Sequence, residues 1–430
     1  MKRHLLLLLS LLFVSAIAVG CSEGNAETTG SNSSTGSEEG EEPKEVYIFH
    51  PKVEIADQLE AMAAEFEEEY TDIDIRLEAL GGGADYRPAL KAKFSSGEEP
   101  DIFINGGFTE LELWKEHLAD LSDEPWVEHV LPIGKEPMTD SEGKLYGMPI
   151  NLEGYGIVYN KKLFEEAGIT EKPTTLSELK EAAQKLENSG ITAFAAGYGE
   201  YWIPGEHLIN VPFAKQDDSA SFIQGLNEGT TSIVGNESFE QFKEYIDIEL
   251  AYANDNPLTT DYNTQVTLFA SGETAMLAGQ GNWTEAMIYE IDPEMDMSFL
   301  SIPLSDEADE DLLPVGVPNN WAVNKNSENV EAAKTFLNWM VSSETGQQYI
   351  TEQFKFIPAF DNIEPTGIGA LGESILEYSK AGKTIPWTFY KFPSGASHEF
   401  GSTIQSYAAG NIDYETVLEQ FQATWDSLKE

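Results

Sequence analysis

The chain has 430 residues, of which 41% are hydrophobic and 11% aromatic, and its 75 acidic against 25 basic residues give a formal net charge of −50. This length exceeds what one hydrophobic core usually supports, so two domains are expected. The acidic excess argues against binding of nucleic acid and against docking of a folded domain on anionic lipid, because both need clustered Lys and Arg.

Residues 1–20 predict a secretory signal peptide. A basic Lys-Arg pair precedes an apolar run, Leu5–Val19, which is too short to span a bilayer comfortably. The run ends in AVGC, and Cys21 is the only cysteine of the chain, so no internal disulfide can form. Small residues before such a Cys resemble the lipobox of bacterial lipoproteins, although Ala18 stands where that motif usually has Leu. The resemblance implies an acylated Cys21 at the mature N-terminus; the alternative is an ordinary signal peptide with a coincidental Cys.

Residues 21–44 predict a flexible acidic tether. They lack bulky apolar residues and are rich in Gly, Ser, Thr and Glu, so they cannot bury a core. We therefore expect the folded part to stand off the extracellular face of the cell membrane and to contact it only through Cys21.

From Glu45 onward the pattern alternates between strands and helices. Short apolar or alternating runs predict strands, and apolar residues at helical spacing predict helices. The predicted elements are, in order, a strand over 46–49, a helix over 55–70, a strand over 73–77, a helix over 86–94 and a strand over 100–104. This order is typical of a parallel sheet covered on both faces.

Ligands of such sheets bind at the carboxyl ends of the strands, where loops converge. Here those ends are 50–52, 81–85 and 105–107. Three polar side chains in these loops are therefore candidates for ligand contact: His50, Asp85 and Asn105.

A second α/β region follows. The sequence predicts a strand over 156–159 that leads into a helix at Asn160, and then a helix through Leu186 with Thr174 as its N-cap. The segment SGETAMLAGQGNW, which ends at Trp283, is read as a helical run followed by a small-residue turn. The other expected elements are a strand over 194–196, a largely helical stretch over 219–269, strand-like residues over 313–325 and a helix over 330–340.

Five segments resemble the carbohydrate-binding group of extracellular solute-binding proteins of ABC importers, the group that includes maltose-binding protein. They occur in the order of that family, and the resemblance covers nearly all of residues 45–430. The segments are FSSGEEPDIF (94–103), GKLYGMPINLEGYGIVYNKKLFEEAGI (143–169), KPTTLSELKEAAQKL (172–186), FASGETAMLAGQGNW (269–283) and VGVPNNWAVNKNSENVEAAKTFLNWM (315–340).

The resemblance implies an α/β protein with the two-lobe, type II periplasmic-binding-protein-like fold. Lobe one would comprise residues 45–152 and 318–365, and lobe two residues 153–317 and 366–430. A hinge joins the lobes in this family, the ligand lies in the cleft between them, and the permease senses the closure of the cleft. A monomer is expected.

Neutral sugars present apolar faces and rings of hydroxyls, so a sugar site needs flat aromatic side chains for stacking and carboxylates or amides for hydrogen bonds. Trp283 matches a stacking Trp of the family and follows small residues that let the backbone approach the cleft; the alternative is a buried core indole. Glu200 and Trp202, in GEYW, fall where the family often has an acid and an aromatic, although ordinary loop packing is the alternative for Trp202.

Further candidates lie around the expected hinge. Glu153 matches a family position whose carboxylate bonds sugar hydroxyls, and Tyr155 is nearby, although strand alternation would send it to the core. Trp321 points either to the cleft or to the hinge, with Asn320 beside it as an amide donor. Trp387 is either a further wall of the cleft or a core residue.

No resident cofactor is expected, and the sequence lacks the motifs of a zinc site, a nucleophile or a P-loop, whereas its many acid pairs leave glycoside hydrolysis open. The six His residues lack zinc-ligand spacing, no GxSxG elbow occurs, and the Gly triplet at 81–83 is not followed by the rest of a P-loop. The expected function is capture of a neutral carbohydrate, foremost an oligosaccharide, for an ABC permease with its ATPase. The alternatives are a secreted glycoside hydrolase, or the same fold with a polyamine, peptide or metal ion as ligand.

Overall fold

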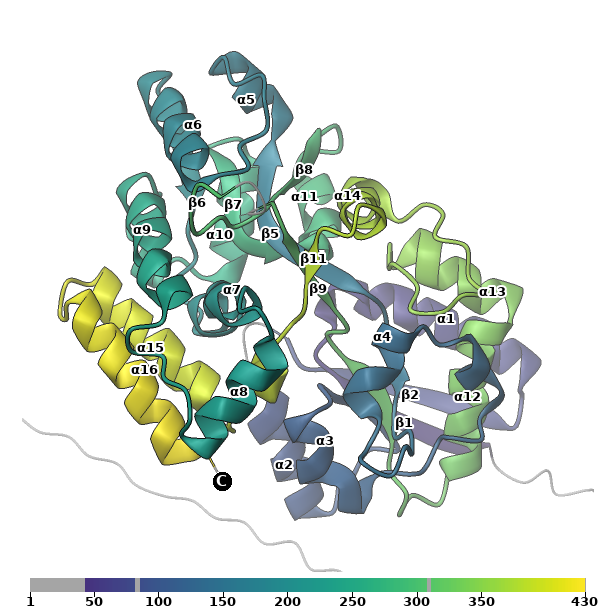
Figure 1. Ribbon diagram of the computed structural model, residues 1–430. Helices are drawn as coiled ribbons and strands as arrows, with labels where there is room; N and C mark the ends of the chain where they lie inside the picture. The colour runs from purple at the N-terminus through teal and green to yellow at the C-terminus, as the bar shows by residue number, and fades with distance from the viewer. Residues whose placement is uncertain (1–42, 82–85, 308–310, 430) are drawn as a thin grey trace, which may run out of the picture. The chain divides into compact units, whose positions relative to one another are not determined.

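The computed structural model describes residues 43–81, 86–307 and 311–429 (Figure 1). Contacts group residues 42–430 into one unit, and every helix and strand given for this protein belongs to it. The predicted signal peptide, Cys21, nearly all of the tether and the candidate Asp85 lie outside the described residues.

The first sheet has five strands in the order β2-β1-β3-β10-β4. β1 pairs in parallel with β2 and β3, and β10 runs antiparallel between β3 and β4. The β-α-β-α-β order expected at the start of the folded part is therefore confirmed. The strands are β1 (Lys44–His50), β2 (Ile73–Ala79), β3 (Ile102–Asn105), β4 (Met148–Pro149) and β10 (Asn320–Val323).

The second sheet has six strands, five of them in the order β11-β9-β5-β7-β6, with β8 paired to β5. β5 is the central strand and pairs antiparallel with β7, β8 and β9, whereas β6 runs parallel to β7. The strands are β5 (Glu153–Asn160), β6 (Thr192–Ala195), β7 (Thr274–Gly281), β8 (Met297–Leu300), β9 (Leu313–Gly316) and β11 (Thr384–Ile385).

Helices cover both sheets, because their apolar faces need a partner surface. At the first sheet, α1 (Ala56–Glu69) packs against β2, and α12 (Val330–Ser342) packs against β1 and β10. At the second sheet, α6 (Leu176–Asn188) packs against β6, α10 (Tyr262–Ala270) against β6 and β7, and α14 (Gly369–Lys380) against β5, β8 and β9.

The other helices are shorter or lie at the periphery. The α-helices are α2 (Tyr86–Ser96), α3 (Thr109–Trp114), α4 (Pro132–Lys135), α5 (Lys161–Glu166), α7 (Ile209–Ala214), α8 (Ser219–Glu228), α9 (Glu237–Ala251), α11 (Glu285–Ile291) and α13 (Glu344–Gln348). The 3-10 and π turns are η1 (Val53–Ile55), η2 (Lys115–His117), η3 (Pro125–His129), η4 (Glu136–Met138), η5 (Ile203–Leu208), η6 (Pro257–Thr259), η7 (Asn282–Thr284), η8 (Tyr349–Gln353) and η9 (Phe389–Lys391).

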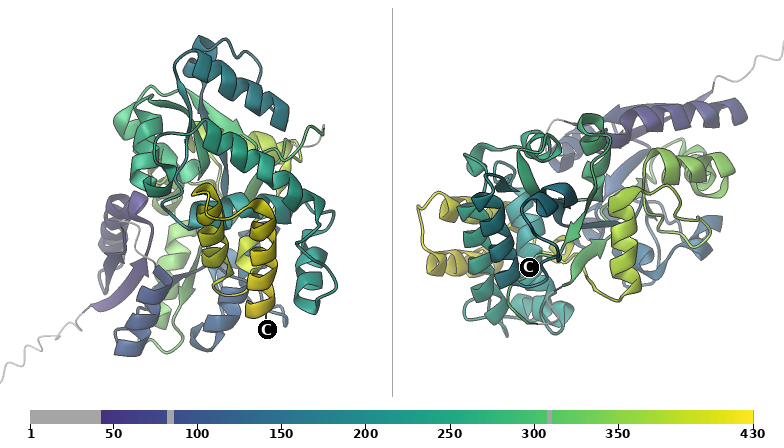
Figure 2. Two further views of the ribbon diagram at one scale, coloured as in Figure 1. Left: turned by 90° about the vertical axis from the view of Figure 1, so that its left-hand side faces the viewer. Right: turned by 90° about the horizontal axis from the view of Figure 1, so that it is seen from above.

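The last two helices, α15 (Ala396–Ala408) and α16 (Tyr414–Leu428), lie side by side, and α15 packs on η5 (Figure 2). Two glycines allow this close approach. A Cβ on Gly205 would lie 2.1 Å from the carbonyl oxygen of Ser397, and one on Gly401 would lie 2.5 Å from that of Tyr201. The C-terminal helices therefore hold the segment from Tyr201 to η5 in place.

Within the described residues the chain crosses between the two sheets three times, once through the longer segment 354–368 and twice through short links. β4 ends at Pro149 and β5 begins at Glu153, while β9 ends at Gly316 and β10 begins at Asn320. Glu153 and Gly316 are paired in register, so these two links lie next to each other. The start of the central strand β5 is therefore held at the junction of the two sheets.

Two local predictions are wrong. The N-cap of α6 is Thr175 and not Thr174, because the Thr175 hydroxyl accepts from the Glu178 amide, while the Glu178 carboxylate accepts from both threonine amides. Residues 274–281, read as a helical run and a turn, form strand β7, whose eight residues are all buried. A short apolar run looks the same in sequence whether it forms a buried strand or a buried helix. Here the pairing with β5 shows that it is a strand.

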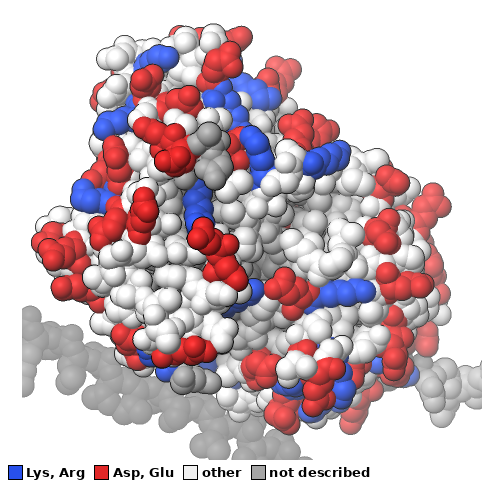
Figure 3. All heavy atoms as spheres, viewed as in Figure 1, with Lys and Arg blue, Asp and Glu red and all other residues white. Residues whose placement is uncertain are grey.

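Acidic side chains are spread over the face seen in Figure 3, with basic ones between them. Charges exposed in this way remain hydrated, so they oppose aggregation at little cost to the fold. In the described part of the chain, no helix is both long and apolar enough to cross a membrane.

One acidic side chain is instead inside the second-sheet core. Glu249, on α9, is 0% exposed. Burial raises the pKa of its carboxyl from 4.5 to about 8, although the neighbouring phenols of Tyr245 and Tyr198 favour the ionised form. The folded protein thus holds this proton up to about pH 8, whereas the unfolded chain releases it near pH 4.5.

Because the raised pKa is a property of the folded state, the contribution of Glu249 to stability is full below pH 4.5 and is lost as pH rises through 8. We expect Glu249→Gln to raise the melting temperature, and the gain to grow from about pH 5 to about pH 9. Thermal unfolding across this range measures it. Glu244→Gln, an exposed position on the same helix, is the control and should give a flat difference; a flat difference for Glu249→Gln as well would contradict the argument.

Candidate functional site

A cavity of about 370 Å³ lies between residues of the two sheets. The first-sheet side contributes the loop after β1, the start of α2 and the end of β3. The second-sheet side contributes the start of β5, the segment from Glu200 to His207, Trp283 after β7, and residues 387–390. As expected for an α/β sheet, the carboxyl ends of β1 and β3 open into it.

Aromatic rings surround His207 in the wall of this cavity. The ring centroid of His207 lies 5.1 Å from that of Trp202, 5.2 Å from Trp283 and 6.3 Å from Trp387. Tyr155 stacks on the imidazole at 4.3 Å and is itself fully buried. The wall is therefore a set of flat rings supported by the core of the second sheet.

The orientation of Trp283 follows from the end of β7. Its Nε1 donates to Oε1 of Gln280 at 3.2 Å, and Nε2 of Gln280 donates to Oε1 of Gln265 at 2.8 Å. A Cβ on Gly281 would lie 2.1 Å from the Trp283 ring, so only glycine lets the ring fold back beside the strand. The indole is half-buried, and part of it is open to the cavity.

A buried ion cluster joins the two sheets beneath the rings. Nζ of Lys52, after β1, lies 2.7 Å from Oε1 of Glu153 and 3.3 Å from Oε1 of Glu54. Asn151 donates to the same Glu153 oxygen at 3.0 Å. Burial acts to lower the pKa of Lys52, but the two carboxylates outweigh it and raise the pKa. Burial raises the pKa of Glu54.

A second ion cluster spans the cavity nearer to solvent. Nε of Arg87, on α2, lies 3.6 Å from Glu110, and its Nη1 lies 3.7 Å from Glu206 in η5. Burial acts to lower the pKa of Arg87, whereas Glu206 and Glu110 raise it. The side chain of Arg87 is 45% exposed, so this contact between the two sides of the cavity is accessible to water.

Five of the candidates from the sequence line the cavity: Trp283, Trp202, Glu153, Glu200 and Trp387. They come from four separate segments and meet only in the folded chain. Their proximity fits the proposed sugar site, and their contact with a ligand stays a prediction.

Five other candidates are not among the residues of the cavity wall: His50, Asn105, Tyr155, Asn320 and Trp321. All are buried. For Tyr155 this is the core position that strand alternation indicated, and contact of the five with a ligand stays a prediction. The Asn320 side-chain amide donates to the backbone carbonyl of Asn105 at 3.1 Å, so it links β10 to β3. Trp321 packs edge-on against His50 in the first-sheet core, and burial, with Lys52 nearby, lowers the pKa of His50 to about 4.

The sequence reading missed several residues of the wall. Lys52 stood in a strand-end loop that was identified, but Arg87 and His207 gave no signal, because each lies in an ordinary helical pattern. In the sequence, Glu54, Glu110 and Glu206 look like any other of the 75 acidic residues. Only the folded structure shows that their carboxylates line the cavity.

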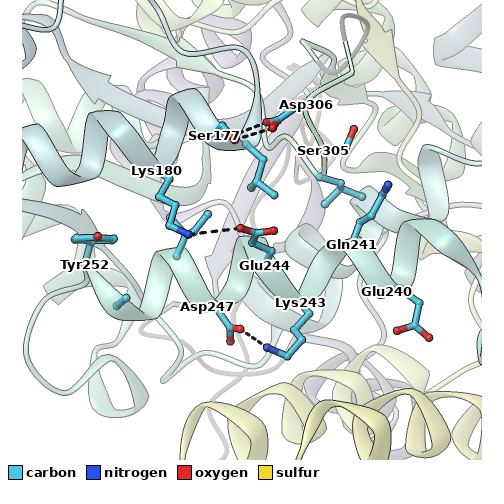
Figure 4. A pocket seen from close by; sticks show the side chains of 14 residues that line it. Ser177, Lys180, Glu240, Gln241, Lys243, Glu244, Asp247, Tyr252, Ser305 and Asp306 are labelled. Carbon is cyan, nitrogen blue, oxygen red and sulfur yellow. Dashed lines mark hydrogen bonds and ion pairs between the residues drawn. The ribbon is translucent and has the colours of Figure 1, made fainter.

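A second hollow, of about 680 Å³, lies between α6 and α9 on the second-sheet side (Figure 4). Its charged side chains pair with one another: Lys180 lies 3.6 Å from Glu244, Lys243 pairs with Asp247, and Ser177 bonds Asp306. Although it is larger than the cavity, it lacks a wall of aromatic rings, with Tyr252 as its one aromatic lining residue. The cavity around His207 is therefore the candidate site.

Two sheets linked by short crossings, with a cavity of rings and carboxylates between them, define a solute-binding protein. The chain belongs to the family of bacterial extracellular solute-binding proteins, whose model matches residues 52–347. The resemblance found in the sequence motifs is thus confirmed.

Characterised relatives in this family bind sugars. The melibiose/raffinose/stachyose-binding protein MelE of Bacillus subtilis is 22% identical over 384 residues, which are 87% of each chain. An uncharacterised ABC transporter extracellular-binding protein of Pyrococcus horikoshii is 26% identical over 315 residues, or 70% of this chain and 68% of the relative. Both relatives are binding proteins.

Solved structures share the fold. The solute-binding protein RafE in complex with raffinose has a TM-score of 0.78 at 20% identity and covers 90% of this chain and all of its own. A sugar transporter protein of Bacillus licheniformis in complex with stachyose has a TM-score of 0.72 at 25% identity, over 89% of this chain and 100% of the other. The type II periplasmic-binding-protein-like fold is therefore confirmed.

The buried ion cluster predicts a strong effect of removing its cation. Lys52→Met leaves Glu153 and Glu54 close together without their counter-charge, so we expect a loss of about 3–5 kcal/mol in the free energy of unfolding. Urea denaturation measures it. Lys144→Met, at an exposed Lys whose carboxylate partners are 3.9 and 4.0 Å away, is the control and should cost less than about 1 kcal/mol. Equal losses for the two variants would contradict this account.

Proposed function

We propose that this protein captures an extracellular oligosaccharide in the cavity around His207 and delivers it unchanged to the membrane permease of an ABC importer. The observation that carries the proposal is the wall in which Trp202, Trp283 and Trp387 stand beside carboxylates. Indole faces stack on the apolar faces of sugar rings, and carboxylates accept strong hydrogen bonds from sugar hydroxyls. The sugar ligands of MelE and RafE support the same class of ligand.

The proposal includes movement of two lobes. Residues 45–152 with 318–365 form lobe one, and residues 153–317 with 366–430 form lobe two. The short links at 149–153 and 316–320 act as the hinge, because a few residues between rigid sheets can absorb the change in backbone angles. The contact of Arg87 with Glu206 joins the two lobes across the cavity.

The proposal also includes the site of action. Cys21 is acylated, and the acidic tether of residues 21–44 holds the folded part outside the cell membrane. The protein works as a monomer, and energy for transport comes from the ATPase of the importer. A lipid anchor keeps the binding protein close to its permease, which raises the effective concentration for docking.

Isothermal titration with neutral oligosaccharides tests the ligand class. Raffinose, stachyose and maltotriose are suitable sugars, and spermidine tests the polyamine alternative. We expect saturable binding of at least one sugar and none of spermidine. Binding of spermidine alone would overturn the proposal.

The indole wall predicts which substitution matters. Trp283→Ala should weaken sugar binding at least tenfold, or about 1.4 kcal/mol, because a stacking face is lost. Trp321→Phe, a neighbouring indole that does not line the cavity, should keep affinity within about threefold. If Trp283→Ala also stays within threefold, the stacking role is wrong.

Prolonged incubation separates a binder from a glycoside hydrolase. We expect chromatography to recover the bound oligosaccharide intact after a day with excess protein. Release of shorter sugars that persists after repurification, and that disappears in Glu153→Gln, would assign hydrolysis to this cavity instead.

A further inference from the structure

The charged groups of the cavity wall carry an excess of negative charge. Five carboxylates line it, those of Glu54, Glu110, Glu153, Glu200 and Glu206, against the two cations Lys52 and Arg87. Each cation already contacts two of the carboxylates. Four of the five carboxylates have side chains no more than 15% exposed, so water does little to screen them.

His207 adds a neutral acceptor at the centre of the ring wall. Its Nδ1 lies 2.7 Å from the carbonyl oxygen of Gly279, which can only accept, so Nδ1 carries the proton and donates. Burial lowers the pKa of the imidazole to about 4, so the ring is neutral near pH 7. The other ring nitrogen, Nε2, is then unprotonated and can only accept a hydrogen bond.

Donors near His207 are few. The Trp283 indole N–H is used by Gln280, and that of Trp387 is fully buried, with no hydrogen-bond partner among the described residues. The stacking of Tyr155 and the Gly279 bond fix the imidazole, so the ring cannot turn to offer its Nδ1–H instead. A ligand group seated here meets acceptors and negative charge, with the N–H of Trp202 as the indole donor that remains.

We propose that His207 and the carboxylates around it select oligosaccharides whose sugar ring next to His207 has free hydroxyls. N-acetylated and anionic sugars are excluded. This inference rests on the proposed function. A free hydroxyl donates a hydrogen bond to Nε2 of His207 or to a carboxylate, so the acceptor has a partner in the complex. An acetamido group keeps one N–H donor but adds a carbonyl acceptor, and few donors near His207 are available to it, so this carbonyl would be buried without a partner. A uronate adds a negative charge beside poorly screened carboxylates.

Matched sugars test the restriction without any mutation. Cellotriose and triacetylchitotriose share one β-1,4-linked backbone and differ at C2, and trigalacturonate brings charge; raffinose, stachyose and maltotriose widen the free-hydroxyl series. We expect the tightest ligand of the free-hydroxyl series to bind at least tenfold more tightly than triacetylchitotriose or trigalacturonate, measured by isothermal titration. Equal or tighter binding of either modified sugar overturns the restriction while leaving sugar capture in place. If no sugar of either kind binds, both the proposed function and this inference fail.

A variant tests the part that His207 plays. His207→Phe keeps a flat ring against Tyr155 but removes the acceptor, so affinity for the best free-hydroxyl sugar should fall about tenfold and the discrimination against triacetylchitotriose should shrink. A merely structural role would lower both affinities together and leave their ratio unchanged. His129→Phe, at an exposed His outside the cavity, is the control and should change neither value. If the melting curve shows that His207→Phe does not fold, the comparison of sugars on the native protein still tests the restriction.

Discussion

The pairing of Lys52 with Glu153 and Glu54 is the interaction on which the site depends. A buried cation is stable only where carboxylates replace the water that it has lost. Lys52 follows the first strand of the first sheet, and Glu153 begins the central strand of the second, so the pair joins the two sheets at their junction. Because the junction is fixed there, the carboxyl ends of β1 and β3 face the aromatic wall supported by the second sheet.

The aromatic wall is rigid for reasons that lie outside the cavity. Gly281 gives Trp283 room to fold back, and Gly205 lets α15 press on the π turn that carries His207. Tyr155 fills the core behind the imidazole. A wall that is already ordered loses little conformational entropy when a ligand arrives, so more of the stacking energy is available for binding.

Charge has two separate roles in this chain. At the surface, hydrated carboxylates keep a protein of net charge −50 in solution. Inside the cavity, carboxylates are poorly hydrated and pair with Lys52 and Arg87, and Arg87 reaches from one side of the cavity to Glu206 on the other. Composition alone cannot separate these roles, because Glu206 and an exposed glutamate such as Glu244 look the same in sequence.

The sequence by itself determined the local elements and the family. The period of apolar residues predicted most helices and strands, and five ordered motifs identified the fold. The same motifs pointed to Trp283 and Glu153, which line the cavity. It misread residues 274–281, because a short buried strand has no period that separates it from a helix. Only the tertiary structure decided that Trp321 belongs to the core while His207 and Arg87 line the cavity. The physical reason is that a site built from distant segments is set by which faces pack together, and packing partners are not encoded in local spacing.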